Sequence, residues 1–189
     1  MKKVGKVLKY IFLAFIVVFN VAMIVRVQIQ KDTSTLNGIV SNDILKAAYR
    51  QNGGDNFAED HEIPETMTAS GDFSVYALHY IPSASQLQVT VRMNQAVLDD
   101  RSADSLDYFT FNITDQYENA IPESGRVTAK KLMYNYIRLT FDNVTLPEEY
   151  QLHLEAHTPT ARLAGLVLYE PLADETPHKL TKSEIAALK

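Results

Sequence analysis

The sequence predicts a mostly β protein: an N-terminal transmembrane helix followed by a single antiparallel β-sandwich of about seven strands. Two observations support this fold class. An apolar run occupies residues 10–27, and apolar and polar side chains alternate with a period of two in short segments of residues 71–172. No long helical pattern separates these segments, so two antiparallel sheets packed face to face are expected. The sandwich should be immunoglobulin-like or jelly-roll-like, although the Cys…Trp…Cys signature of true immunoglobulin domains is absent.

The N-terminal helix is predicted at residues 10–27, which follow a basic tail at residues 1–9. Residues 10–25, sixteen in all, have two polar side chains, Tyr10 and Asn20. As a helix they would cover ~24 Å, slightly less than the ~30 Å of a bilayer core. Four side chains are the expected contacts with the membrane: Lys9, Tyr10, Asn20 and Arg26.

The distribution of lysines predicts the orientation of this helix. Four lysines precede the apolar run, whereas Arg26 and Lys31 lie at and just after its end, so the positive-inside rule places the N-terminus in the cytoplasm and exports the rest of the chain. A cleaved signal peptide begins in the same way and is the alternative, but the end of the run has no A-x-A cleavage pattern. The predicted localisation is the cell membrane of a bacterial envelope, with one span and an extracytoplasmic C-terminal domain.

Charge and composition exclude several classes of function. The chain carries a formal charge of −5, and residues 1–27 hold five bases and no acid, which leaves −10 for residues 28–189. A nucleic-acid-binding domain would need the opposite sign, so no nucleic-acid partner is predicted. The absence of Cys rules out disulfides, a Cys-ligated zinc site and a cysteine nucleophile.

Residues 28–70 are predicted to form a stalk or linker with one short helix. Apolar residues at helical spacing, with Ser41 or Asn42 as the N-cap, predict this helix through Ala48. The Gly- and Asn-rich residues 51–56 would end it. The acids that follow have no base among them, which favours an extended, solvated segment over the lesser alternative of a calcium site.

The β-sandwich domain is predicted at residues 71–172. Its expected strands are residues 73–80, 87–93, 108–114, 125–131, 136–142, 150–157 and 163–169. Residues 87–93 alternate most clearly and predict a strand with one solvated face. Residues 163–169 are apolar on both faces and predict a central strand. Lys130 and Lys131 favour an edge strand.

The C-terminal tail, residues 173–189, is predicted to be polar and to end in a short helix. The residues from Thr181 to Glu184 match a capping box, in which two side chains satisfy the first backbone N–H groups of a helix. Such a short helix is marginal in water and should fray or dock. Residues 70–172 are therefore expected to fold without either flanking segment.

Candidate chemistry is sparse, so the sequence predicts no catalytic residue, no metal site and no cofactor. His153 and His157 have a metal-like spacing, but on a strand they would lie ~13 Å apart, too far for one ion. A weak candidate for a calcium site is the acidic loop that contains Asp99, Asp100, Asp104 and Asp107. Helix capping and turn formation by Asp explain this loop more simply. No G-x-S-x-G, phosphate-loop or H-E-x-x-H motif occurs. The protein is accordingly not predicted to be an enzyme.

Tyrosines in and beside the strands supply the candidate binding surface. An exposed Tyr offers a rigid apolar ring with a polar tip, which suits a partner protein or a sugar. The candidates are Tyr76, Tyr80, Tyr108, Tyr134 and Tyr136. The predicted function is a membrane-anchored, non-enzymatic binding or accessory module with a protein partner in the envelope. The alternatives are an anchored carbohydrate- or wall-binding module and a small hydrolase with two distant carboxylates.

Overall fold

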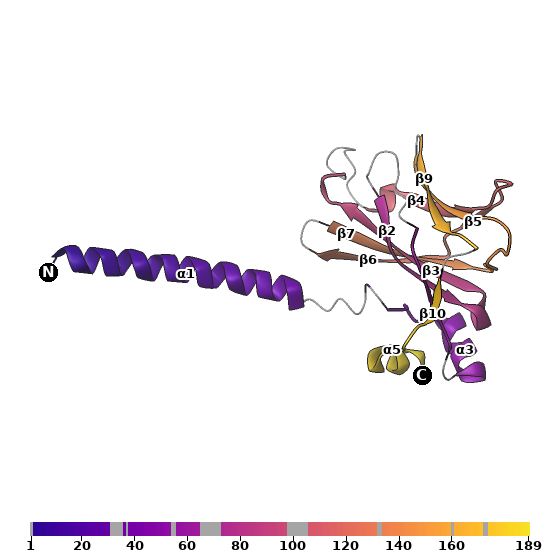
Figure 1. Ribbon diagram of the computed structural model, residues 1–189, viewed down its shortest axis with the longest axis horizontal. Coiled ribbons are helices and arrows are strands. Elements are labelled where there is room, and N and C mark those ends of the chain that lie inside the picture. The colour runs from indigo at the N-terminus through magenta and orange to yellow at the C-terminus, as the bar shows by residue number, and fades with distance from the viewer. Residues whose placement is uncertain are drawn as a thin grey trace. The chain divides into compact units, whose positions relative to one another are not determined.

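The computed structural model divides the chain into two compact units, Met1–Thr33 and Ser34–Lys189. It describes residues 2–30, 36, 38–53, 56–64, 73–97, 106–131, 134–159, 161–171 and 174–189. The second unit is mostly β and contains two antiparallel sheets (Figure 1).

The first unit contains the helix α1 (Lys2–Gln30), which includes the whole predicted apolar run. Its described large apolar side chains are exposed, as are Lys9 and Tyr10. Asn20 donates a hydrogen bond to the Ile16 carbonyl oxygen of the same helix (2.7 Å), so the amide is satisfied locally.

The predicted transmembrane anchor is not supported. Within the part of the chain that the structure describes, no helix is long and apolar enough to cross a membrane. The side chain of Arg26, the expected contact at the far end, lies outside the described side chains.

The second unit has a six-stranded sheet in the order β10-β1-β2-β3-β7-β6 and a four-stranded sheet in the order β5-β4-β8-β9. The first comprises β1 (Glu59–His61), β2 (Phe73–Ile81), β3 (Gln86–Asn94), β6 (Gly125–Lys131), β7 (Tyr134–Asp142) and β10 (Glu175–Pro177). The second comprises β4 (Thr110–Thr114), β5 (Ala120–Pro122), β8 (Leu152–Thr158) and β9 (Ala161–Tyr169). Short 3-10 turns stand at η1 (Pro82–Ala84) and η2 (Leu106–Tyr108). The predicted strands correspond to β2, β3, β4, β6, β7, β8 and β9, which confirms each of them.

The main core fills the space between the two sheets. Every second residue of β3 and β7 points into it, as the period-two alternation requires. The fully buried members include Leu87, Val89, Val91, Met93, Ile137, Leu139 and Phe141. At one end the Phe73 ring packs edge-to-face on Phe109 and Phe111, with centroids 5.4 and 5.8 Å away.

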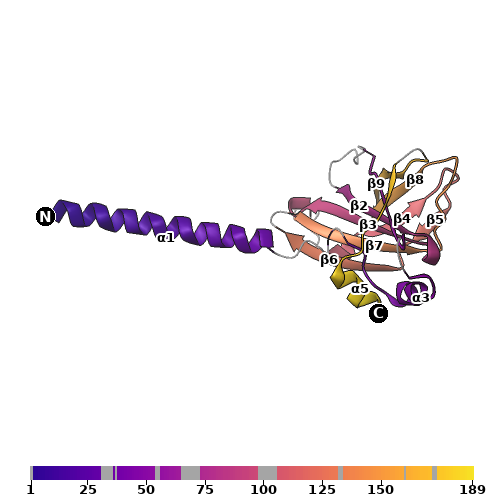
Figure 2. The same cartoon turned by 60° about the horizontal axis from the view of Figure 1, so that its bottom comes forward.

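A second, smaller core lies under two helices, α3 (Asp43–Asn52) and α5 (Lys182–Leu188). Both views show these helices on the side of the six-stranded sheet opposite to the four-stranded sheet (Figures 1 and 2). Asn42 caps α3 by accepting a hydrogen bond from the Leu45 N–H, and Thr181 and Glu184 form the predicted capping box of α5. The buried members of this core are Ile39, Leu45, Ala48, Phe57, Ala58, Ile81 and Leu188.

Residues 28–70 and 173–189 are therefore not a free stalk and a free tail, because much of each belongs to the folded domain. β1 pairs with β2, and β10 pairs with β1, so both segments extend the sheet. The reason is that the outer face of β2 and β3 carries Ile81 and uncharged polar groups, which these segments cover. Independent folding of residues 70–172 stays a prediction.

The outer face of β3 illustrates this covering. The sequence predicts it to be solvated, yet Gln88 is fully buried. Its amide accepts a hydrogen bond from the Val40 N–H (2.7 Å) and donates one to the Val40 carbonyl (2.8 Å). Arg138 on β7 donates to Thr90 Oγ1 (2.7 Å) and to the Leu36 carbonyl oxygen. Polar side chains thus take the place of a partner strand for the backbone groups of Leu36 and Val40.

The two predictions about the position of a strand in its sheet have different outcomes. β6, with Lys130 and Lys131, is an edge of the six-stranded sheet, which confirms the prediction. β9 is an edge of the four-stranded sheet, so its prediction as a central strand is wrong. Its apolar residues on both faces are explained by packing, because Leu166 and Leu168 are buried in the main core while Leu163 and Tyr169 pack partly against it.

Candidate functional site

The short strand β1 places two groups of histidine and carboxylate side chains on opposite faces of the six-stranded sheet. Side chains alternate along a strand, so Glu59 and His61 share one face while Asp60 points to the other. Asp60 lies directly across from His79 of β2, and His61 lies across from Glu175 of β10. We call these the outer cluster (Asp60, His79, His178, Glu184) and the inner cluster (Glu59, His61, Glu175).

In the outer cluster, one carboxylate contacts both histidine rings through their Nδ1 atoms. Asp60 Oδ1 lies 2.5 Å from His79 Nδ1 and 2.8 Å from His178 Nδ1. The two rings meet edge-to-face with centroids 4.9 Å apart. His178 Nε2 then lies 3.1 Å from Glu184 Oε1. A continuous chain of polar contacts therefore joins β2, β1, the segment after β10 and α5.

Glu184 is fixed in place by groups from two distant parts of the chain. Its Oε2 accepts hydrogen bonds from the Thr181 N–H (2.6 Å) and hydroxyl (2.7 Å). Its Oε1 accepts one from the Ile39 N–H (2.8 Å). Because the side chain is 8% exposed, these contacts replace water as partners of its charge.

Burial and hydrogen bonding assign the charges in the outer cluster. Burial lowers the pKa of His79, so its ring is neutral at pH 7. Burial alone would raise the pKa of Asp60, but hydrogen bonds from both histidines outweigh it and lower this pKa. Burial likewise opposes ionisation of Glu184, whose pKa is nevertheless lowered by hydrogen bonds from Thr181 and His178. Burial disfavours charge on His178, but hydrogen bonds to Asp60 and Glu184 raise its pKa.

The polar atoms of the inner cluster have fewer hydrogen-bond partners than those of the outer cluster. His61 is 6% exposed, and neither of its ring nitrogens has a hydrogen-bond partner among the described residues. Its Nε2 lies 3.5 Å from Glu59 Oε2, and its ring packs edge-to-face against Tyr80 and Tyr169. Burial and then the charge of Glu59 raise the pKa of Tyr80, while burial followed by Glu175 and Glu59 raises that of Tyr169.

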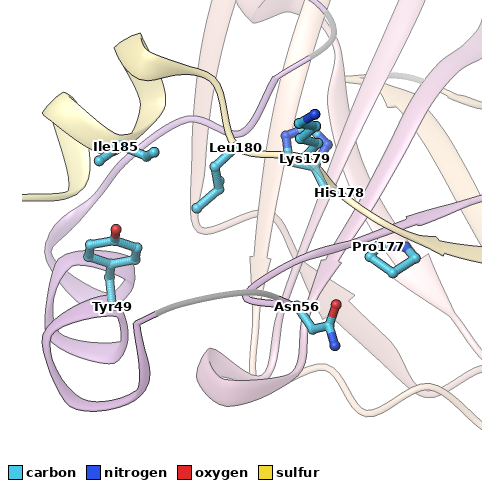
Figure 3. Close-up of a pocket in the computed structure, with 7 residues that line it drawn as sticks. All are labelled: Tyr49, Asn56, Pro177, His178, Lys179, Leu180 and Ile185. Carbon is cyan, nitrogen blue, oxygen red and sulfur yellow. The ribbon is translucent and has the colours of Figure 1, made fainter.

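A pocket of about 560 Å³ lies beside the outer cluster (Figure 3). Its lining residues are Tyr49, Asn56, Pro177, His178, Lys179, Leu180 and Ile185. The close-up shows Tyr49 of α3 and Ile185 of α5 on one side of it, with Pro177 and Asn56 on the other. His178 thus belongs both to the outer cluster and to the pocket wall.

A separate polar site occupies the four-stranded sheet. Glu155 of β8 is 8% exposed and pairs with Arg162 of β9, while its Oε2 lies 3.3 Å from His157 Nε2 and accepts from Asn112 Nδ2 at 3.3 Å. Burial alone would raise the pKa of Glu155, but hydrogen bonds from Asn112 and Thr114 and the charge of Arg162 lower it. These residues line a pocket of about 390 Å³.

The structure divides the five predicted tyrosines into two groups. Tyr80 and Tyr108 pack partly against the main core, so they do not form an exposed row with the others. Tyr76, Tyr134 and Tyr136 gather with Arg92 on the outer face of the six-stranded sheet. We call these four residues the Tyr–Arg surface.

Contacts within the Tyr–Arg surface hold its rings at angles to one another. Tyr76, which is 38% exposed, packs edge-to-face on Tyr136 with centroids 5.3 Å apart and an interplanar angle of 75°. The Arg92 guanidinium lies 4.9 Å from the centroid of the Tyr134 ring, and Arg92 Nε donates to Ser74 Oγ at 3.3 Å.

The structure describes part of the other candidate sites, the acidic loop and the histidine pair. Asp99, Asp100 and Asp104 lie outside the described residues, so the acidic loop as a whole is not placed. Asp107 lies 3.8 Å from Arg126, an ion pair in which the carboxylate is largely exposed. His153 and His157 lie on β8, a strand as predicted.

Sequence reasoning missed the outer cluster as a site. Its four residues come from four separate elements, and no fixed spacing relates them. The one available signal was the capping box, which located Glu184 but not its partners. The chain matches no protein-family model, and comparison with curated proteins and with solved structures gave no significant match. The site is therefore argued from its own geometry.

Proposed function

We propose that the chain is a non-enzymatic binding or accessory module of the cell envelope, which engages a protein partner through the Tyr–Arg surface. One observation carries the proposal: Tyr76, Tyr134, Tyr136 and Arg92 lie together on adjacent strands of a sheet, with Tyr76 exposed, Tyr134 and Arg92 half-buried and Tyr136 buried. Tyr and Arg are the residue types that most often dominate binding energy at protein interfaces. Placement on strands keeps the rings ordered before binding, which reduces the entropy lost on association.

The arrangement of the rings favours a protein over a carbohydrate. Sugars stack on an open, flat ring face, whereas Tyr76 and Tyr136 are inclined at 75° and Arg92 already lies over Tyr134. Beside this group, Val127 of the neighbouring strand β6 is 50% exposed. A protein partner that presents an apolar side chain and a carboxylate would complement these rings and the Arg92 charge.

Site-specific crosslinking in cells tests this proposal. A photoreactive amino acid is placed at Tyr76 in one tagged full-length chain and at Tyr117, an exposed tyrosine between β4 and β5 (73% exposed), in a matched control. We expect one recurrent protein adduct from position 76 and none of that mass from position 117. Co-purification of the same protein should fall with Arg92→Ala.

Two results would contradict the proposal. One is the same set of adducts from both positions, which would indicate unspecific contact. The other is the absence of a protein adduct together with retention of the chain on wall polysaccharide that Tyr76→Ala abolishes. That second result would favour the carbohydrate-binding alternative.

Localisation in the cell membrane, with a cytoplasmic N-terminus and an extracytoplasmic domain, stays a prediction, as does the choice between immunoglobulin-like and jelly-roll-like topology. Cell fractionation of the full-length chain and of a variant that lacks residues 1–33 tests the first point. Recovery of both forms in the same soluble fraction would contradict it.

A further inference from the structure

We propose that Asp60, His79 and His178 form a binding site for one divalent transition-metal ion of the zinc type. The proposal is independent of partner binding at the Tyr–Arg surface. It rests on three observations: the convergence of the donor atoms, the support of one ligand by Glu184, and the burial of His79.

The donor atoms converge as a metal site requires. Asp60, His79 and His178 each offer one ligand atom, and these atoms all lie within 4.8 Å of one another. Bonds of ~2.0–2.1 Å at tetrahedral angles place neighbouring ligands ~3.3 Å apart. The contacts of Asp60 Oδ1 with the two Nδ1 atoms, 2.5 and 2.8 Å, reach that spacing with small rotations of side chains. Two imidazoles and one carboxylate suit zinc better than calcium or magnesium, which prefer oxygen ligands.

The second ring nitrogen of His178 has the support typical of a metal ligand. A metal-bound histidine usually donates its other N–H to a carboxylate, which fixes the tautomer and the ring orientation. Glu184 Oε1 lies 3.1 Å from His178 Nε2, and Thr181 and Ile39 hold the carboxylate in place. This arrangement directs His178 Nδ1 toward Asp60.

The other histidine is fixed by burial. His79 is 3% exposed, and its Nε2 has no hydrogen-bond partner among the described residues, so the contact of Nδ1 with Asp60 defines the polar environment of the ring. Because His178 also lines the neighbouring pocket, water can reach a fourth coordination position. The ion would join β1, β2 and the segment that leads into α5, so binding should stabilise the docking of the C-terminal residues.

Zinc titration of the purified full-length protein, freed of metal with a chelator, tests the proposal. We expect one Zn²⁺ per chain with a Kd of about 1 µM or tighter by competition with a chromogenic chelator. Saturating zinc should raise the Tm by roughly 5–10 °C. Asp60→Asn, His79→Gln and His178→Gln should each weaken binding by about 100-fold or more, and Glu184→Gln by ~10-fold. His153→Gln, on the four-stranded sheet, is the matched control and should bind as the wild type does.

Spectra of the wild-type protein keep the test decisive if a variant does not fold. In long-range ¹H–¹⁵N spectra, zinc should shift Nδ1 of both His79 and His178 while Nε2 of His178 stays protonated. Failure to bind zinc would overturn the proposal. So would binding that His61→Gln abolishes and Asp60→Asn preserves, since that result would place the ion in the inner cluster.

Discussion

Replacement of Gln88 by Leu tests whether residues 38–42 belong to the folded domain. Gln88 is fully buried and makes three hydrogen bonds: two with the Val40 backbone (2.7 and 2.8 Å) and one with Gln86 Oε1 (3.0 Å). Each such bond contributes about 0.5–1.5 kcal/mol, and a buried backbone group left without a partner costs about 1–3 kcal/mol. Leu has a similar size and recovers part of this loss through apolar burial. We therefore expect Gln88→Leu to lower the free energy of unfolding by about 2–4 kcal/mol.

Urea denaturation followed by circular dichroism measures this loss, and hydrogen exchange at the Val40 amide locates it. The matched control is Gln151→Leu, because Gln151 is exposed and its amide donates a hydrogen bond to the side chain of Glu170 (3.1 Å). The control should change stability by less than about 0.5 kcal/mol. If Gln88→Leu is equally silent and exchange at Val40 is unchanged, residues 38–42 are a solvated stalk and the covering of β3 is wrong.

Three further predictions concern other parts of the domain. Leu188→Ala removes a fully buried side chain from the second core and should cost about 2–4 kcal/mol in urea denaturation, with faster exchange in α5. Because the pKa of Glu155 is lowered in the folded state, its contribution to stability is complete above its ordinary pKa of 4.5 and is lost as the pH falls through the lower folded value. Glu155→Gln should therefore flatten the curve of stability against pH below about pH 5, as measured by urea denaturation. Finally, residues 34–189 should give a cooperative unfolding transition and residues 70–172 a weaker or aggregating one; equal transitions would show that the terminal segments contribute nothing.

The strands that the sequence predicts correctly share one property. Each contains at least five residues, and all of them except β6 place one face in the main core, so burial leaves a period-two pattern in the sequence. β1, β5 and β10 have three residues each, too few for a period to show. The capping box of α5 was predictable because it depends on residues within one turn.

Burial of the outer face could not be predicted from local pattern. Gln86, Gln88 and Thr90 are polar, and polar residues alternating with apolar ones normally face solvent. They are buried because Leu36, Val40 and Asn42, near the N-terminal end of the second unit, bring backbone and side-chain groups that match their hydrogen-bonding capacity. The same long-range pairing assembles the outer cluster, so counting histidines and their spacing along the chain could not reveal it.

The outer cluster lies in the part of the six-stranded sheet where the strands are shortest. β1 and β10 are three-residue strands, which supply few ladder hydrogen bonds. Two further backbone hydrogen bonds stabilise the pairing of these strands. The His178 N–H donates to the Ala58 carbonyl oxygen (2.8 Å), and the Glu62 N–H donates to the Asp174 carbonyl oxygen (2.9 Å). The side-chain contacts of Asp60 and Glu184 add to these, so the docking of the C-terminal segment depends on polar groups as much as on apolar burial.

A metal ion at this point would therefore act on stability more than on recognition. Its binding free energy would appear as increased protection of residues 178–188, because the ion would hold His178, at the start of this segment, against Asp60. The Tyr–Arg surface lies on β2, β3 and β7 and shares no side chain with the outer cluster. Sites that are far apart and share no partner residues usually make additive contributions to the free energy. Zinc should thus leave the affinity of the protein partner unchanged while it slows hydrogen exchange in α5, and a strong effect of zinc on partner binding would show that the two sites are coupled.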